Sequence, residues 1–229
     1  MTPATRSSRP WYWDQDPAPP PRPAFEGPAR CDVAIVGGGL AGVTAALELA
    51  ERGYRVVLLE AEQVGWGASG RSGAQALPGL AASQQKMKRL IGADPARRVW
   101  DMTVEGMDLI RERIARHAID CDWRSGQMHV AIKPRHTAEL AAWHEELQRE
   151  YGYHSVRLLD RAQVRAEVAS ERYVSGLVDD NGGHLQPLRY LRGLAAAAEA
   201  AGARIHERSR VLGYRAGERI LVRTAESAV

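Results

Sequence analysis

Residues 32–60 constrain the fold most strongly, because they place two apolar strands, a glycine-rich turn and a helix in a fixed order. DVAIV (32–36) and RVVLLE (55–60) are almost wholly apolar and show no polar alternation. Such runs are typical of parallel strands that are buried on both faces. Between them, GGGLAG opens a helical stretch that Gly53 ends. This order of elements predicts an α/β fold with a parallel sheet.

The glycine turn has the spacing of a phosphate-binding loop. Gly37, Gly39 and Gly42 match GxGxxG between the strand and the helix. Gly37 permits a tight turn, Gly39 lets backbone approach a pyrophosphate, and Gly42 lets the helix lie close to the sheet. The helix start attracts phosphates. Glu60 ends the next strand, where it would accept hydrogen bonds from ribose hydroxyls and repel a 2′-phosphate, which argues against NADP. A dinucleotide site is predicted, with NAD and FAD both open.

The segment GWGASGRSGAQ (65–75) favours one of these two ligands. It holds four glycines and has neither helical nor strand periodicity. In a nicotinamide dehydrogenase, the strand that ends in the acid normally leads into an ordinary helix. A long loop of small residues instead suits backbone that lies along an extended ligand and offers N–H groups to it. FAD is such a ligand, so this loop favours FAD over NAD.

With these motifs, residues 31–75 resemble the glycine/D-amino-acid-oxidase-like FAD-dependent oxidoreductases, and within them the gamma-glutamylputrescine oxidoreductase branch. The resemblance is carried by DVAIVGGGLAGVTAALELAERGYRVVLLEAEQVGWGASGRSGAQ. It continues more loosely through WDMTVEGMDLIRERI, GQMHVAIKPRH and DDNGGHLQPLRYLRGLAAAAEAAGARIHERSRV. It implies FAD as the cofactor and a Rossmann-like FAD-binding domain with an inserted antiparallel α+β substrate domain.

The resemblance also implies which residues hold FAD. Those at its pyrophosphate and adenosine ribose would be Gly37, Gly39, Leu40, Ala41, Gly42, Glu60 and Ala61. Those along the middle and the flavin end would be Ser69, Gly70, Arg71, Ser72 and Gly73. The backbone of Val211 would meet the adenine.

Two segments depart from the pattern of this branch. The loop reads GRSGAQ where GRNGGQ is usual, so Ser72 and Ala74 replace an asparagine and a glycine. Because serine is shorter than asparagine, we expect a looser hold on the flavin end. GGHLQP stands where a GGHLHP-like pattern is usual, so Gln186 replaces a histidine. His184 is retained, and a structural role is favoured for it.

The resemblance further implies oxidation of an amine or an amino acid. A hydride would pass from the carbon that bears the amine to flavin N5, water would hydrolyse the imine, and oxygen or another acceptor would reoxidise the flavin. A neutral amine needs no protein base for this reaction, and we assign no catalytic residue. The alternatives are a non-catalytic FAD-binding fragment that needs a missing half or a partner and, less favoured, an NAD-dependent enzyme.

The expected organisation has four parts. A proline-rich arm (1–29) precedes a first FAD-binding segment (30–120), a partial substrate domain (121–183) and a second FAD-binding segment (184–229). Members of the family continue past the position of Val229, so we expect the C-terminal part to be missing. Missing sheet neighbours would leave strand edges exposed, and we expect a partner chain or a second copy to cover them.

Some local elements are also predicted. Asp94 and Pro95 predict a helix start. Alternating apolar residues predict a half-exposed antiparallel strand over 127–133. Residues 175–184 predict a strand that leads into a tight glycine turn. The aromatic residues of 11–13 are expected to pin the arm to the chain's own surface.

Composition argues against several classes of protein. The chain has 31 basic and 28 acidic residues, a net charge of +3, and no basic run that would favour nucleic acid binding. Cys31 and Cys121 are not clustered, which predicts small buried apolar residues rather than disulfide partners, and no residues gather at metal-ligand spacing. Neither an apolar run long enough to cross a membrane nor a secretory leader is found, so we expect a cytoplasmic protein.

Overall fold

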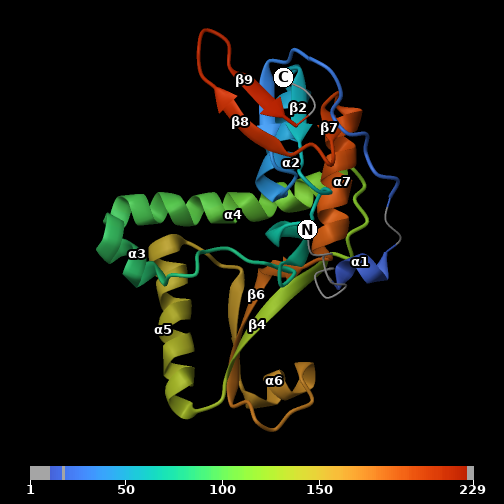
Figure 1. Ribbon diagram of the computed structural model, residues 1–229. Helices are drawn as coiled ribbons and strands as arrows, with labels where there is room; N and C mark the ends of the chain where they lie inside the picture. The colour runs from blue at the N-terminus through green and yellow to red at the C-terminus, as the bar shows by residue number, and fades with distance from the viewer. Residues whose placement is uncertain (1–10, 17–18, 226–229) are drawn as a thin grey trace, which may run out of the picture. The chain divides into compact units, whose positions relative to one another are not determined.

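The computed structural model describes residues 11–16 and 19–225, which divide into two compact units (Figure 1). The first unit holds the described residues up to Ala74, residues 113–121, and those from Gln186 onward. The second holds residues 75–112 and 122–185. Residues 75–112 thus group with the second unit, although the sequence analysis placed them in an FAD-binding segment. The functional assignment of these segments stays a prediction.

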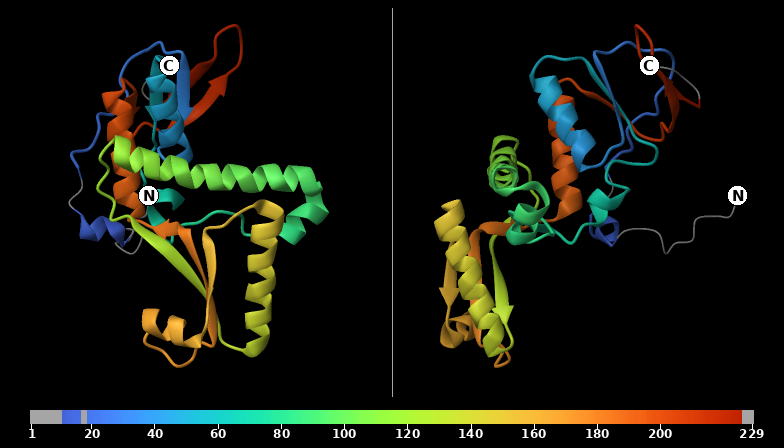
Figure 2. Two further views of the ribbon diagram at one scale, coloured as in Figure 1. Left: turned by 180° about the vertical axis from the view of Figure 1, so that it is seen from behind. Right: turned by 90° about the vertical axis from the view of Figure 1, so that its left-hand side faces the viewer.

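A three-stranded parallel sheet in the order β1-β2-β7 forms the centre of the first unit. Helices α2 and α7 pack against each other and against strands of this sheet (Figure 2). The predicted strands and crossover helix of residues 32–60 are therefore confirmed. Burial of β1 on both faces is not, because β1 is only partly buried and Val36 is 61% exposed. The elements of this unit are α1 (Tyr12–Gln15), β1 (Val33–Val36), α2 (Leu40–Glu51), β2 (Val56–Leu59), the 3-10 helix η2 (Ala68–Arg71), α7 (Pro187–Ala200), β7 (Arg204–His206), β8 (Val211–Arg215) and β9 (Leu221–Thr224).

The middle strand of the sheet, β2, is buried along its whole length. Strands β8 and β9 form an antiparallel hairpin, and Val222 of β9 packs with Val57 and Leu59 of β2 and with Phe25. Because side chains alternate along a strand, Val56 faces the opposite side, which the helices cover. Apolar contacts on both faces explain why β2 has no polar alternation.

The arm is attached to the first unit through particular side chains. Trp13 is buried and meets the ring of Trp66 edge-on, with 5.8 Å between ring centroids. Phe25 is buried in the cluster beside β2. Trp11, by contrast, is exposed. Tyr12 donates a hydrogen bond to the carbonyl oxygen of Ser72, so Tyr12 and Trp13 attach the arm while Trp11 does not.

An antiparallel sheet forms the centre of the second unit, with β6 as its central strand. Strand β4 pairs along the length of β6, while β5 and β3 pair with its first and last parts. The elements of this unit are β3 (Gln75–Ala76), α3 (Gln84–Ile91), α4 (Ala93–Arg116, whose last turn belongs to the first unit), β4 (Arg124–Ala131), α5 (Pro134–Tyr151), β5 (Val156–Leu159), α6 (Arg161–Glu167) and β6 (Ser175–His184).

The antiparallel strand expected over 127–133 is confirmed as β4, in a different sheet from β1 and β2, but the expectation of an exposed face was wrong. Met128 packs on one face with Val164 of α6. On the other face, the ring of His129 lies 4.9 Å from that of Trp143 of α5. Ile132 was expected on the apolar face, but it follows the end of β4 and is 41% exposed. Because a helix covers each face, the strand has no solvent face along its middle.

The expectation of a tight glycine turn within 175–184 was also wrong, since β6 runs unbroken to His184. Its last residues pair with both neighbours, and Gly183 lies opposite Ser125 and Ala76. A Cβ on Gly183 would lie 2.6 Å from the carbonyl oxygen of Arg124. These glycines therefore allow close strand packing rather than a change of direction.

Helix positions differ from the sequence-based expectation in several places. The short helices α1 and α6 lie in segments for which no helix was predicted. Helix α3 was not predicted, and Gln84 is its one buried residue. Its start is capped by Ser83, whose hydroxyl accepts a hydrogen bond from the Lys86 N–H. Helix α4 begins at Ala93, so Asp94 lies in its first turn instead of capping it. Among the described residues, none of the helices is long and apolar enough to cross a membrane.

The core of the first unit can be tested at Leu194, which lies on the buried face of α7 with no exposed surface. Leu194→Ala removes packed methyl groups and leaves a cavity, so we expect the free energy of unfolding to fall by about 2–5 kcal/mol. Urea denaturation followed by circular dichroism measures this loss.

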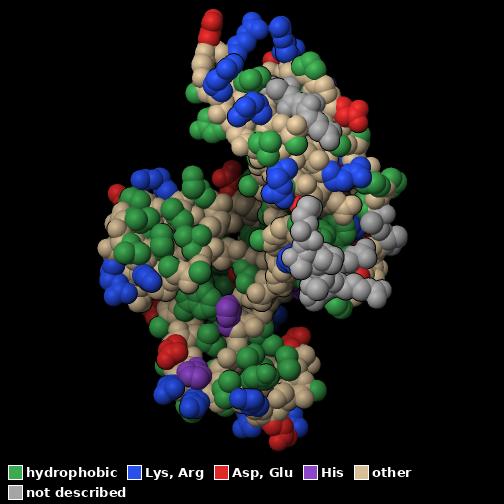
Figure 3. Space-filling model, viewed as in Figure 1, with side chains coloured by type: hydrophobic (Ala, Val, Ile, Leu, Met, Phe, Trp, Pro, Cys, Tyr) green, Lys and Arg blue, Asp and Glu red, His purple; other side chains and the backbone are tan. Residues whose placement is uncertain are grey.

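The matched control is Leu212→Ala on the β8–β9 hairpin, whose outer surface carries basic and apolar side chains (Figure 3). Leu212 is 64% exposed. We expect this variant to change the free energy of unfolding by less than about 0.5 kcal/mol. Equal losses in the two variants would contradict the core described here.

Candidate functional site

The first glycine turn joins the carboxyl end of β1 to the start of α2. Gly37 has a φ of +104°, a conformation that favours glycine, and its N–H donates to the carbonyl oxygen of Leu59 at 2.9 Å. A Cβ on Gly42 would lie only 2.1 Å from the carbonyl oxygen of Gly37. Gly39 is the N-cap residue of α2 and has no side chain to satisfy the first helical N–H groups. Glycine is thus required at both ends of the turn.

Glu60 reaches from the end of β2 back to this turn. Its Oε2 accepts a hydrogen bond from the Gly38 N–H at 2.5 Å, and its Oε1 accepts one from the Glu62 N–H at 2.8 Å. Each carboxylate oxygen keeps further lone-pair capacity. Two backbone donors therefore hold the carboxylate in place while it can still accept hydrogen bonds from a ligand. Ala61, the next residue, is half-buried.

The small-residue loop forms a second glycine turn of the same construction. Gly65 has a φ of +82°, and a Cβ on Gly70 would lie 2.0 Å from its carbonyl oxygen. The spacing Gly65-x₄-Gly70 repeats the spacing Gly37-x₄-Gly42. Helix η2 follows this turn as α2 follows the first. This repeated spacing was visible in the sequence, but the sequence analysis did not use it.

Two hydrogen bonds join the turns. The Gly65 N–H donates to the carbonyl oxygen of Gly38 at 3.0 Å. The Leu40 N–H, at the start of α2, donates to Ser69 Oγ at 2.9 Å. A Cβ on Gly39 would lie 3.1 Å from the same Ser69 Oγ. The structure therefore brings Gly39, Leu40 and Ser69 together, as a shared ligand site requires.

The remaining residues of the second turn hold its outer end. Arg71 Nε donates to the carbonyl oxygen of Trp66 at 3.0 Å, and its guanidinium lies 5.5 Å from the centre of the Trp66 ring. The carbonyl oxygen of Ser72 accepts a hydrogen bond from the hydroxyl of Tyr12 at 3.3 Å. The Ser72 hydroxyl accepts one from the Ala74 N–H at 3.4 Å. Serine at this position therefore bonds within its own loop.

Val211 lies on the β8–β9 hairpin. It pairs with Thr224, and its half-buried side chain packs against the cluster that contains Val57 and Leu59. Its side chain therefore packs in the core, and the predicted contact of its backbone with the adenine stays a prediction.

Two positions noted in the sequence have structural roles. Gln186 caps α7, because its Oε1 accepts a hydrogen bond from the Arg189 N–H at 2.7 Å. Its Nε2 donates to Asp16 Oδ2, also at 2.7 Å. Pro187, at the first helical position, was a signal for this cap. His184 is exposed at the end of β6.

Both glycine turns have open faces that suit a dinucleotide. A Cβ added at Gly37, Gly67 or Gly73 would meet no heavy atom of the described chain within 4 Å. Glycines with open space beside their Cα atoms, an acid at the end of β2 and a helix start are features that suit a dinucleotide. Within residues 11–16 and 19–225, no cluster of His, Cys, Asp or Glu could hold a metal ion.

Burial raises the pKa of the Cys31 thiol.

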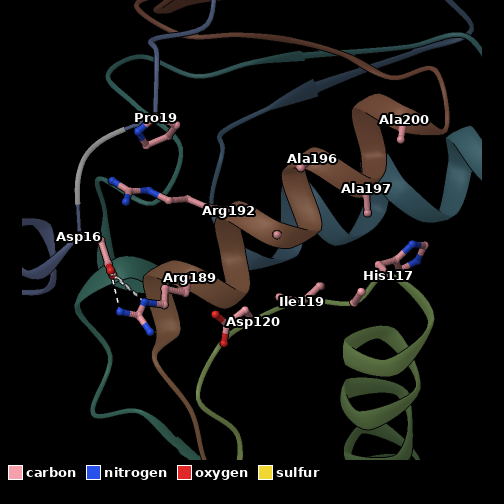
Figure 4. A pocket seen from close by; sticks show the side chains of 12 residues that line it. Asp16, Pro19, His117, Ile119, Asp120, Arg189, Arg192, Ala196, Ala197 and Ala200 are labelled. Carbon is pink, nitrogen blue, oxygen red and sulfur yellow. Dashed lines mark hydrogen bonds and ion pairs between the residues drawn. The ribbon is translucent and has the colours of Figure 1, made fainter.

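A pocket of the first unit lies elsewhere, beside α7 (Figure 4). It has a volume of about 660 Å³ and is lined mainly by α7, by residues 117–120 and by Asp16. The residues of the two glycine turns do not line it. Because the turns offer an open backbone surface, their suitability for a ligand does not depend on an enclosed cavity.

Comparison with known proteins identifies the family and the length of its members. Residues 32–229 match the family model DAO, described as FAD dependent oxidoreductase. Over 225 residues the chain is 39% identical to the probable oxidoreductase OrdL of Haemophilus influenzae, covering 96% of this chain and 52% of that protein. Over 199 residues it is 42% identical to gamma-glutamylputrescine oxidoreductase of Escherichia coli, covering 87% and 46%. The chain spans about half the length of these curated relatives.

The fold matches solved structures as well. L-amino acid deaminase from Proteus myxofaciens, determined in complex with anthranilate, matches with a TM-score of 0.75 at 21% identity. The match covers 90% of this chain and 45% of that one. This likeness confirms the predicted mixed α/β fold, with its parallel and antiparallel sheets.

One departure from the family pattern carries a prediction about stability. Ala74 has a φ of +68°, in the left-handed region that favours glycine, which is the usual residue here in the branch that the sequence resembles. Ala74→Gly should relieve this strain and raise the free energy of unfolding by about 0.5–1 kcal/mol. Urea denaturation measures the change.

Ala68→Gly, in the helical conformation of η2, is the control for the added flexibility of glycine. We expect it to lower the free energy of unfolding by about 0.5–1 kcal/mol. If Ala74→Gly lowered stability as much as Ala68→Gly, the backbone conformation at Ala74 would be in error.

Proposed function

Because this chain belongs to the DAO family of FAD dependent oxidoreductases, we propose that its first unit binds FAD across the two glycine turns and that the whole protein oxidises an amine or an amino acid. The observation that carries the proposal is the joining of the turns by the Gly65–Gly38 and Leu40–Ser69 hydrogen bonds. The joined turns offer an extended ligand one helix start and two stretches of glycine backbone on the same unit.

Each part of the cofactor has proposed partners on this chain. At the pyrophosphate and the adenosine ribose they are Gly37, Gly39, Leu40, Ala41, Gly42, Glu60 and Ala61. Along the middle and the flavin end they are Ser69, Gly70, Arg71, Ser72 and Gly73, and at the adenine the backbone of Val211. The helix start and the neutral N–H groups would stabilise the phosphate charge, and Glu60 would orient the ribose.

The redox chemistry belongs to the cofactor. When bound, FAD supplies at N5 the acceptor for a hydride from the carbon that bears the substrate amine. The side chains of the first unit bind and orient the cofactor, and the second unit is proposed to belong to the substrate domain. A relative named gamma-glutamylputrescine oxidoreductase supports an amine as the substrate class. We assign no residue of this chain to proton transfer.

A second candidate is FAD binding without turnover by these 229 residues alone. It is favoured by the observation that the chain spans about half of its curated relatives. Amine-dependent bleaching of bound flavin under anaerobic conditions separates the two, because it requires a complete substrate site. A partner chain or a second copy along the edge strands β1 and β7 stays a prediction.

The cofactor assignment is tested by Gly39→Val and Glu60→Ala. A branched side chain at Gly39 would press on Ser69 Oγ and cover the helix start, so we expect FAD retention to be lost. Glu60→Ala removes a charged acceptor, and we expect the Kd for FAD to rise about tenfold. Visible absorption of the protein after addition of FAD and desalting measures retention.

Gly106→Ala in α4 is the control, because a Cβ there would meet no described atom within 4 Å. It should retain FAD as the wild type does. Far-UV circular dichroism establishes that each variant is folded before its flavin content is compared. Full flavin content in folded Gly39→Val and Glu60→Ala would show that the turns were assigned wrongly.

A further inference from the structure

The described arm, residues 11–16 and 19–29, contacts the outer end of the second glycine turn. The hydroxyl of Tyr12 donates to the carbonyl oxygen of Ser72. The buried ring of Trp13 packs edge-on against Trp66. Trp66 in turn holds Arg71 through its carbonyl oxygen and its ring. Both ends of the stretch from Trp66 to Ser72 are therefore in contact with the arm.

Helix α7 fixes the arm beside these contacts. Asp16 pairs with the guanidinium of Arg189 at 2.7 Å and accepts a hydrogen bond from Gln186, at the start of α7 (Figure 4). The hydrogen bond with Arg189 holds the pKa of Asp16 below its usual value. The guanidinium of Arg192 lies 4.7 Å from the centre of the Trp13 ring. Contacts with α7 therefore hold this part of the arm in addition to its contacts with the second turn.

A third contact reaches the start of the second turn through a buried carboxylate. Glu207 is 4% exposed, and its Oε1 accepts a hydrogen bond from the Val64 N–H at 3.0 Å. Its Oε2 accepts one from the backbone N–H of Arg22 at 3.1 Å. The Arg22 guanidinium lies 3.4 Å from Oε1. Val64 directly precedes Gly65, so the arm and Glu207 together fix the entry to the turn.

Arg22 places a positive charge beside the buried side chain of Glu207. A buried carboxylate without a partner is strongly unfavourable. Arg22 also pairs with Glu199, through hydrogen bonds of 2.8 and 2.7 Å, but Glu199 is more exposed than Glu207, and the Val64 N–H donates to Glu207. One arginine therefore joins two carboxylates, and only Glu207 leads to the glycine turn.

We infer that the arm positions the second glycine turn for the cofactor, with Tyr12, Trp13 and Arg22 acting through Ser72, Trp66 and the Glu207–Val64 hydrogen bond. None of these arm residues is assigned a contact with FAD, so they are positioning residues. The inference rests on the proposed function, because it concerns the affinity of that same site. A positioned turn loses less freedom when the ligand binds, which raises affinity.

The test compares Glu207→Met with Glu199→Met, the same change on the two carboxylates that Arg22 contacts. Glu207→Met leaves the Val64 N–H without its acceptor, so we expect the Kd for FAD to rise at least about tenfold. Glu199→Met should change it less than about twofold. Glu207→Gln keeps an oxygen that can accept from Val64, and we expect it to restore most of the affinity. Quenching of FAD fluorescence during titration of the full chain measures these constants.

Tyr12→Phe tests the other end of the turn without removing a buried group. We expect it to raise the Kd for FAD about threefold and to leave the unfolding temperature of the cofactor-free chain unchanged. Hydrogen exchange of the Val64–Gly73 amides in the cofactor-free chain should be faster in Glu207→Met and unchanged in Glu199→Met. This readout needs no bound cofactor.

The outcomes separate this inference from the proposed function. A wild-type chain that binds no FAD would overturn the proposed function, and the positioning role for FAD with it. A wild type that binds FAD, with equal Kd values for Glu207→Met, Tyr12→Phe and Glu199→Met, would overturn the positioning role alone. The positioning role would also fall if Glu207→Met left the exchange of the Val64–Gly73 amides unchanged.

Discussion

The two glycine turns depend on close approaches of backbone to backbone that no side chain permits. Gly42 lies against the carbonyl oxygen of Gly37, and Gly70 lies against that of Gly65, each where a Cβ would come within about 2.1 Å of the oxygen. These approaches let the Gly65 N–H reach the carbonyl oxygen of Gly38. The first turn lies between β1 and α2. Its packing therefore helps to set the positions of the strand, the helix and the second turn. Loss of glycine at any of these positions would separate the turns.

The surrounding structure holds this arrangement from several sides. Glu60 joins β2 to the first turn, and Glu207, just after β7, joins the arm to the second. Both acids follow neighbouring parallel strands, and the carboxyl ends of such strands are where α/β sheets bind ligands. Helix α7 stabilises the second turn and the arm. Its leucines pack beside Gly65, and Gln186 at its start binds Asp16 of the arm. Segments far apart in the sequence thus meet at one site.

Local pattern was sufficient to predict part of this structure. The apolar runs 32–36 and 55–60 predicted the two parallel strands, and for β2 the reason is its burial along the whole strand. Helix α3 (Gln84–Ile91) was missed because it is short and buries little, although Met87, Leu90 and Ile91 have helical spacing. The residues around Gly183 were taken for a turn because their need for glycine comes from a neighbouring strand. The contact of Ser69 with Leu40 depends on tertiary packing, which sequence spacing does not encode.

The central claim is that the two joined turns form one FAD site, and the visible absorption spectrum of the purified wild-type chain tests it most directly. The chain would be mixed with FAD, desalted and measured, with a parallel sample that contains NAD in place of FAD. The account predicts a flavin spectrum at close to one FAD per chain, with no nicotinamide nucleotide retained. A folded chain that emerges colourless, or that retains NAD instead, would contradict it.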